Sequence, residues 1–257
     1  MRTWTPFPHT ALYAFDANRV RTQWPVLHRG DQEPLPQDPA VLQAWVLYHR
    51  GEFQAAAEAG DAAGHSGVIA ANKARLIYAD YLEPTDQARL DLFMDVATRC
   101  EQLAQDQPAC VNAHYLHGYA LGRYSQVVSV AKSLAKGMGT KVKTAFETTL
   151  RLQPEHADAY IALAAFHAEV IDKVGPLIGQ LTYGAKRSTS LELFDQGMAR
   201  IPQAAIALTE YAQGLLMLDG EAQDAAAQAL YQRAAKVKPL DATEHLGVAR
   251  VQAALRV

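Results

Sequence analysis

Two histidines stand at a spacing that could hold a metal ion. His114 and His117 are three residues apart, which places both rings on one face of a helix, and His156 and His167 follow in later segments. Neutral imidazoles at such a spacing can ligate zinc. The alternative is packing, in which each ring fills the interface of a helix pair and bonds a carbonyl or carboxylate group. We favour packing and predict no metal site.

A second group of residues could bind anions. Six basic side chains fall in two segments, with no acidic residue within the first: Lys132, Lys136, Lys141, Lys143, Lys186 and Arg187. If the two segments are neighbours, these residues make a local positive patch that could meet phosphates, anionic lipid or an acidic partner. The alternative is a solvated face, which the balanced net charge of the chain favours.

Familiar catalytic motifs are missing from the sequence. Gly137–Lys141 (GMGTK) lacks the spacing of a phosphate-binding loop, and His65–Gly67 (HSG) is not a nucleophile elbow. There is no H-E-x-x-H motif and no identifiable pair of catalytic carboxylates. A site assembled from distant helices would leave no such motif. The sequence therefore disfavours catalysis without eliminating it, and we predict a non-enzymatic protein without a cofactor.

Composition sets the class of protein. The 257 residues are 49% hydrophobic and 20% charged with a net charge of −3, which gives no general attraction for nucleic acid. The N-terminal residues do not read as a signal peptide, and no run of about 18 apolar residues could span a membrane. Two cysteines, Cys100 and Cys110, fit a reducing compartment. We expect a cytoplasmic protein without a transmembrane segment.

The residues that position these groups are organised around residues 146–167. Phe146, Thr149 and Leu150 share one helical face, Pro154 breaks the helix, and a second amphipathic helix follows. The phasing of aromatic, large and small residues around this proline resembles a tetratricopeptide repeat (TPR). The resemblance implies an all-α, right-handed solenoid of helical hairpins, which begins after residue 36.

The spacing of four prolines gives the length of each predicted hairpin. Pro108, Pro154, Pro202 and Pro239 are separated by 46, 48 and 37 residues, whereas the family period is about 34. Repeats three and four therefore contain lengthened helices or insertions, around residues 129–143 and 170–190. Adjacent repeats touch in a solenoid, so we expect the two insertions to lie together. A final helix at about 242–255 is expected to cap the array.

The second insertion extends the resemblance. Its LTYGAKRSTSLELF segment is similar to TPR proteins of the regulator-of-microtubule-dynamics type and to related bacterial proteins, over about residues 110–255. That similarity implies adaptor-like binding and, in some relatives, membrane-contact or lipid roles. It supplies no functional residue, and the first hundred residues lie outside it.

Residues 1–36 read as a separate arm. They hold five large aromatic side chains among five prolines, and Asp16 could cap a short helix to about Gln23. These aromatic side chains need burial, so we expect the arm to pack on a folded body. The sequence leaves open whether that body, residues 37–257, is its own or a neighbour's.

The resemblance also implies a concave groove lined by the first helix of each pair. Tyrosine and isoleucine stand where relatives that bind chaperone C-termini have lysine, so a chaperone adaptor is disfavoured. The groove is rather apolar and suits a helix, a hydrophobic peptide or the arm itself. Its predicted residues are Asn112, Tyr115, Tyr119, Asp158, Ile161, Ala165, Thr209 and Gln213.

Three functions follow from this interpretation. The first is a scaffold that mediates protein–protein interaction by holding a protein or peptide in the groove. The second is self-assembly into a homo-oligomer or filament through the arm and the ends of the array. The third is a carrier of a small apolar ligand or lipid, held between the insertions and the groove.

Overall fold

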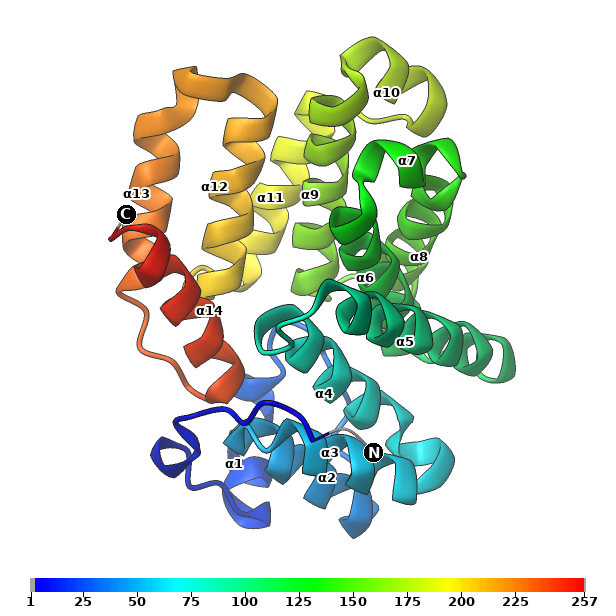
Figure 1. Ribbon diagram of the computed structural model, residues 1–257, viewed down its shortest axis with the longest axis vertical. Coiled ribbons are helices and arrows are strands. Elements are labelled where there is room, and N and C mark those ends of the chain that lie inside the picture. The colour runs from blue at the N-terminus through cyan, green and yellow to red at the C-terminus, as the bar shows by residue number, and fades with distance from the viewer. Residues whose placement is uncertain (1–2, 257) are drawn as a thin grey trace.

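The computed structural model describes residues 3–256 and is all-helical over that range (Figure 1). The helices are α1 (Ala17–Leu27), α2 (Pro39–Arg50), α3 (Phe53–Ala62), α4 (Val68–Tyr81), α5 (Asp86–Asp106), α6 (Val111–Val128), α7 (Val130–Ala135), α8 (Met138–Leu152), α9 (Ala157–Val174), α10 (Pro176–Tyr183), α11 (Arg187–Arg200), α12 (Ala205–Asp219), α13 (Asp224–Ala235) and α14 (Ala242–Ala254). Three short 3-10 turns, Thr10–Leu12, Gly64–Gly67 and Gly220–Gln223, complete the regular structure of this range. None of its helices is both long and apolar enough to cross a bilayer.

Consecutive long helices pack against one another along the chain. α2 contacts α3, α4 contacts α5, α6 contacts α8, α9 contacts α11, and α12 contacts α13. Pro108, Pro154, Pro202 and Pro239 all lie in the connections between helices, as the sequence predicts. Helix ends follow from local chemistry, as at α2, where Asp38 accepts a hydrogen bond from the Ala40 amide and Gly51 ends the helix at φ 84°.

The two insertions lie side by side, as expected. They form the short helices α7 and α10, at the end of the molecule opposite the N-terminal helices (Figure 1). The Tyr183 hydroxyl donates a hydrogen bond of 2.7 Å to the Leu134 carbonyl oxygen. Gly139 leaves room for the Tyr183 ring, because a Cβ there would lie 2.7 Å from it.

The N-terminal arm packs on the body of its own chain. Trp4 stacks on Tyr78 at a centroid distance of 4.1 Å, and Phe7 and Phe15 are buried in the main core. Asp16 caps α1 by accepting from the Arg19 amide, as predicted, although α1 continues to Leu27 rather than ending near Gln23.

The last helix meets the first ones. The sequence places a capping helix at about 242–255, and α14 occupies residues 242–254. It contacts α2 as well as α12 and α13, so the two ends of the array touch (Figure 1). His49 Nδ1 lies 2.7 Å from an Asp241 carboxylate oxygen, and Arg29 donates to Glu244 at 2.7 Å. The array is therefore closed on itself, a feature absent from the sequence-based expectation.

Candidate functional site

The inner helices surround a central cavity of about 240 Å³. Helix α9 runs along its length. The Asp158 amide, at one end of α9, donates a 3.1 Å hydrogen bond to the Gly30 carbonyl oxygen. Near the other end, Val170 packs beside Gly179 of α10. The cavity therefore extends from a polar end beneath residues 28–33 to an apolar end beneath the insertions. The apolar lining includes Leu76, Ile77, Leu116, Val130, Leu134, Val142, Phe146, Ile161, Phe166 and Val170.

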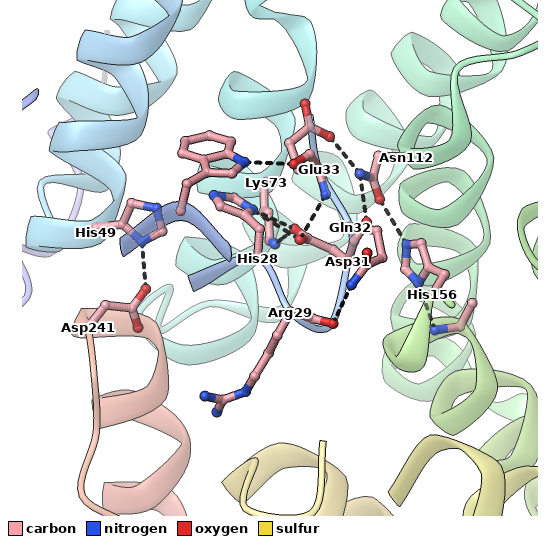
Figure 2. A network of polar contacts seen from close by, with 12 residues as sticks. His28, Arg29, Asp31, Gln32, Glu33, His49, Lys73, Asn112, His156 and Asp241 are labelled. Atoms are coloured by element: carbon pink, nitrogen blue, oxygen red, sulfur yellow. Dashed lines mark hydrogen bonds and ion pairs between the residues drawn. The ribbon is translucent and has the colours of Figure 1, made fainter. Parts of the chain in front are cut away.

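The segment 28–33, which links α1 to α2, forms the polar end (Figure 2). Gly30 approaches α9 closely, since a Cβ at this position would lie only 2.3 Å from an Asp158 carboxylate oxygen. The Trp24 indole N–H donates to the Glu33 carbonyl oxygen at 2.7 Å. The Asn112 amide nitrogen of α6 donates to the Asp31 carbonyl oxygen at 3.1 Å. These contacts fix a loop of the predicted arm against the inner helices.

A buried ion pair lies within this loop. Asp31 is 3% exposed and forms an ion pair with Lys73 of α4, while His28 Nδ1 lies 3.0 Å from the same carboxylate. Although burial opposes ionisation, Lys73 and His28 hold the pKa of the Asp31 carboxyl well below its usual value. Burial also opposes the charged amine, yet Asp31 raises the pKa of Lys73. Both charges are therefore present at neutral pH.

The network continues to α9 through two side chains. His156 Nδ1 accepts a hydrogen bond from the Ala159 amide at 3.1 Å, so its Nε2 carries the proton and donates to the side-chain Oδ1 of Asn112 at 3.0 Å. Burial lowers the pKa of His156 to about 4, which keeps the ring neutral. Asn112 also donates to Glu33 at 2.6 Å. Burial, with Asp31 nearby, raises the pKa of Glu33 to about 7.

A second ion-pair network borders the cavity between α4, α6 and α12. Arg123 donates to Glu210 at 2.8 Å and lies 3.6 Å from the Asp80 carboxylate. The Tyr119 hydroxyl donates to Asp80 at 3.1 Å, and Arg250 of α14 lies 3.6 Å from the same carboxylate. Against the effect of burial, Arg123 and Arg250 lower the pKa of Asp80. These charges are satisfied within the protein.

Two carboxyl groups on the cavity face of α9 are not satisfied in this way. Asp158 accepts no hydrogen bond through its side chain and forms no ion pair within residues 3–256, and burial raises its pKa to about 6. Glu169, eleven residues on, accepts one hydrogen bond of 3.2 Å from Gln126, and burial raises its pKa to about 7. Ile161 and Ala165 lie between them on the same face. This face is apolar in the middle with a carboxyl group at each end.

The structure brings five of the eight predicted groove residues to the central cavity. These are Tyr115, Tyr119, Asp158, Ile161 and Ala165. Asn112 is buried in the network beside the cavity, and Thr209 and Gln213 line a separate depression between α12, α13 and α14.

The histidine pair bonds to the main chain. His114 Nε2 lies 2.9 Å from the Pro108 carbonyl oxygen, and His117 Nδ1 lies 2.9 Å from the Ala97 carbonyl oxygen. These are partners of the kind expected for packing. In the part of the chain that the structure describes, no three potential ligands are grouped to hold a metal ion.

The six predicted basic residues gather around the two insertions. Three are in ion pairs: Lys141 with Glu101 at 3.5 Å, Lys143 with Glu147 at 2.9 Å, and Arg187 with Asp219 at 2.7 Å. Lys132, Lys136 and Lys186 are exposed. The charge of this region is therefore only partly compensated.

Sequence reasoning missed the residues of the polar end, Asp31, Lys73 and His49 among them. They come from segments that pair only in three dimensions. The sequence did contain one indication of this site. Asp31 and Glu33 are acidic residues in an arm whose aromatic side chains are expected to be buried, and buried acidic residues need partners.

No protein-family model matches the chain, and a search of curated proteins finds no match.

Proposed function

We propose that this is a non-enzymatic, TPR-like binding protein that holds a small, largely apolar ligand in its central cavity. The ligand carries a hydrogen-bond donor or a positive charge for Asp158. This proposal selects the carrier hypothesis from the three that the sequence supports.

The proposal rests on the surroundings of the Asp158 carboxyl group. A half-buried carboxyl group without a partner destabilises a protein unless something else satisfies it. The carboxylates of Asp31 and Asp80 form ion pairs, whereas Asp158, which lines the cavity, forms none within residues 3–256. The charges of Lys73 and Arg29 act on Asp158 only from beyond ion-pair distance, and they do not cancel the effect of burial on its pKa. The remaining walls are mainly aliphatic and aromatic, as in sites for small molecules. A ligand with a donor at one end and an apolar body matches both features.

We favour a small ligand over a polypeptide because the volume of the central cavity is only about 240 Å³. The closed ends and the segment 28–33 restrict the space between the inner helices. Tyr115 and Ile161 are 8% and 5% exposed, which leaves little of them for a peptide to contact. Self-assembly through the arm receives less support, since the arm is already buried on its own body.

The proposal includes a right-handed TPR-like solenoid closed into a ring, and a cytoplasmic location. Support for the solenoid comes from successive packed helices with prolines between them and from insertions at the expected places. Support for the location is limited to the two free cysteines.

A neutral fluorophore tests the cavity directly. N-phenyl-1-naphthylamine has an apolar body and one N–H donor, and its fluorescence rises in apolar sites. Titration of the purified protein should show saturable binding. Ala165→Trp should weaken binding at least about tenfold, because the indole occupies the cavity.

The control is Ala226→Trp, which makes the same change on the exposed side of α13. It should leave the affinity unchanged, and circular dichroism should show both variants folded. No binding by the unmodified protein, or equal binding by Ala165→Trp, would overturn the proposal.

A further inference from the structure

The insertion helix α10 exposes a cluster of aliphatic side chains. Leu177, Ile178 and Leu181 are 73%, 57% and 79% exposed, and their spacing places them on one side of the helix. Of the other exposed large apolar side chains in the described chain, Leu12 is 66% exposed, whereas Val26, Leu35, Met94 and Leu255 are only 36–40% exposed, and all five are scattered. Leaving three neighbouring aliphatic side chains in water is unfavourable, so this surface indicates an interaction site.

The same region is strongly basic. Residues 130–145 and 174–191 contain six lysine and arginine residues and no acidic residue, although the whole chain has a net charge of −3. Lys132, Lys136 and Lys186 are exposed and form no ion pair within residues 3–256. The insertions are therefore a positively charged projection on an acidic protein.

The apolar and basic side chains are close together in the fold. The hydrogen bond from Tyr183 to Leu134 joins α10 to α7, which carries Lys132, and Lys186 follows α10 after a two-residue turn. Both helices lie at the same end of the molecule (Figure 1). Below this surface, Val130 and Leu134 line the apolar end of the central cavity.

We propose that α10 and the surrounding lysines dock the protein on an anionic lipid bilayer. The aliphatic side chains enter the interfacial layer while the lysine ammonium groups meet lipid phosphates and carboxylates. The side chains project from a single short helix and present a convex surface. A hydrophobic peptide helix is commonly bound in an apolar groove, but neither the central cavity nor the depression between α12, α13 and α14 is lined by Leu177, Ile178 or Leu181. A bilayer needs no groove. The observations therefore favour lipid over an acidic peptide.

Vesicle flotation tests the proposal with the full chain. We expect the protein to float with vesicles of phosphatidylcholine mixed with phosphatidylserine, to remain unbound with phosphatidylcholine alone, and to detach as salt is raised. The triple variant Leu177→Gln, Ile178→Gln, Leu181→Gln should lose binding. The variant Lys132→Glu, Lys136→Glu, Lys186→Glu should lose at least about fivefold in affinity for each charge.

Matched control variants test whether vesicle binding depends on this surface rather than on the charge or hydrophobicity of the whole protein. Leu12→Gln removes another exposed leucine, and Lys236→Glu with Lys238→Glu removes two exposed lysines near α14. Both controls should bind as the unmodified protein does, and all variants should melt cooperatively. Failure of the unmodified protein to float, or equal flotation of the α10 variant, would overturn the proposal. Capture by an acidic peptide without vesicle binding would also overturn it.

Discussion

At the scale of residues, two aspartates a short distance apart have opposite electrostatic surroundings. Asp31 is buried beside Lys73 and His28, which stabilise its charge. Asp158 lies against the same loop at Gly30 but forms no ion pair within residues 3–256, and burial outweighs the more distant charges of Lys73 and Arg29. Proteins commonly retain such a destabilising group where function requires it. The contrast identifies Asp158 as the residue to test first.

Replacing Asp158 with asparagine should stabilise the folded protein at high pH. A carboxyl group whose pKa is raised on folding destabilises the folded state once pH exceeds its usual value of about 4, and fully so above its folded pKa of about 6. Asparagine does not titrate. We expect Asp158→Asn to raise the free energy of unfolding by roughly 2–3 kcal/mol at about pH 8.

Urea denaturation at several pH values measures this effect. The difference between Asp158→Asn and the unmodified protein should shrink as the pH falls and should vanish below about pH 3, where the Asp158 carboxyl group is protonated in both the folded and the unfolded state. A difference that does not change with pH would contradict the assignment.

At the scale of elements, the packing of α6 on α8 depends on one small residue. A Cβ at Gly118 would lie 2.9 Å from the Phe146 ring and 3.0 Å from the Ala145 side chain. Gly122, one turn later on α6, has no heavy atom within 4 Å of the same position. The two glycines therefore have different roles on one helix.

Alanine substitution should separate these roles. Gly118→Ala should lower the free energy of unfolding by about 1–3 kcal/mol, because α6 and α8 must move apart. Gly122→Ala should raise it by about 0.5–1 kcal/mol, since alanine has the higher helix propensity and nothing obstructs it. Thermal or urea denaturation compares the two variants under one set of conditions. Equal effects of both would show that the α6–α8 contact tolerates a methyl group.

Local chemistry made the helices predictable. Pro154, Pro202 and Pro239 lie between helices, and Asp16 caps a helix through its own neighbours, so both features could be predicted from the local sequence. Pro25 differs, because it lies inside α1. The cavity residues of α9 were also predictable from the sequence, because Asp158, Ile161 and Ala165 recur with the helical period.

Long-range contacts were not predictable from the sequence. The polar end of the cavity joins Asp31, Lys73 and Asn112 from three separate segments. The closing contact joins His49 and Asp241, which are 192 residues apart. Periodicity reports which face of a helix is buried and carries no information about which distant helix covers it.

At the scale of the whole molecule, a small set of polar contacts joins the two ends. Asp241 both accepts from His49 and caps α14 through the Glu244 amide at 2.9 Å. Arg29, in the loop at the polar end of the cavity, bonds to Glu244. Closure and the cavity wall therefore depend on the same few side chains.

Asp241→Ala should loosen the closure. Loss of the cap and of the buried hydrogen bond should lower the free energy of unfolding by about 2–4 kcal/mol. Hydrogen exchange followed by mass spectrometry should show reduced protection in α14 and in the facing part of α2, with α6 and α8 unchanged.

The control is Asp224→Ala, at an exposed position in the first turn of α13. Its effect should stay within about 0.5 kcal/mol. Uniform loss of protection over the whole chain in Asp241→Ala would mean that the ends do not open separately.

The meeting of the two ends also affects how the chain is made. His49 leaves the ribosome 192 residues before its partner Asp241. At about 5–20 residues per second, that delay is on the order of 10–40 s. The early helices can pair with one another during this time, but the central cavity still lacks the part of its wall that includes Asp241 and Glu244. The central cavity of a nascent chain can therefore close only after Asp241 has been synthesised.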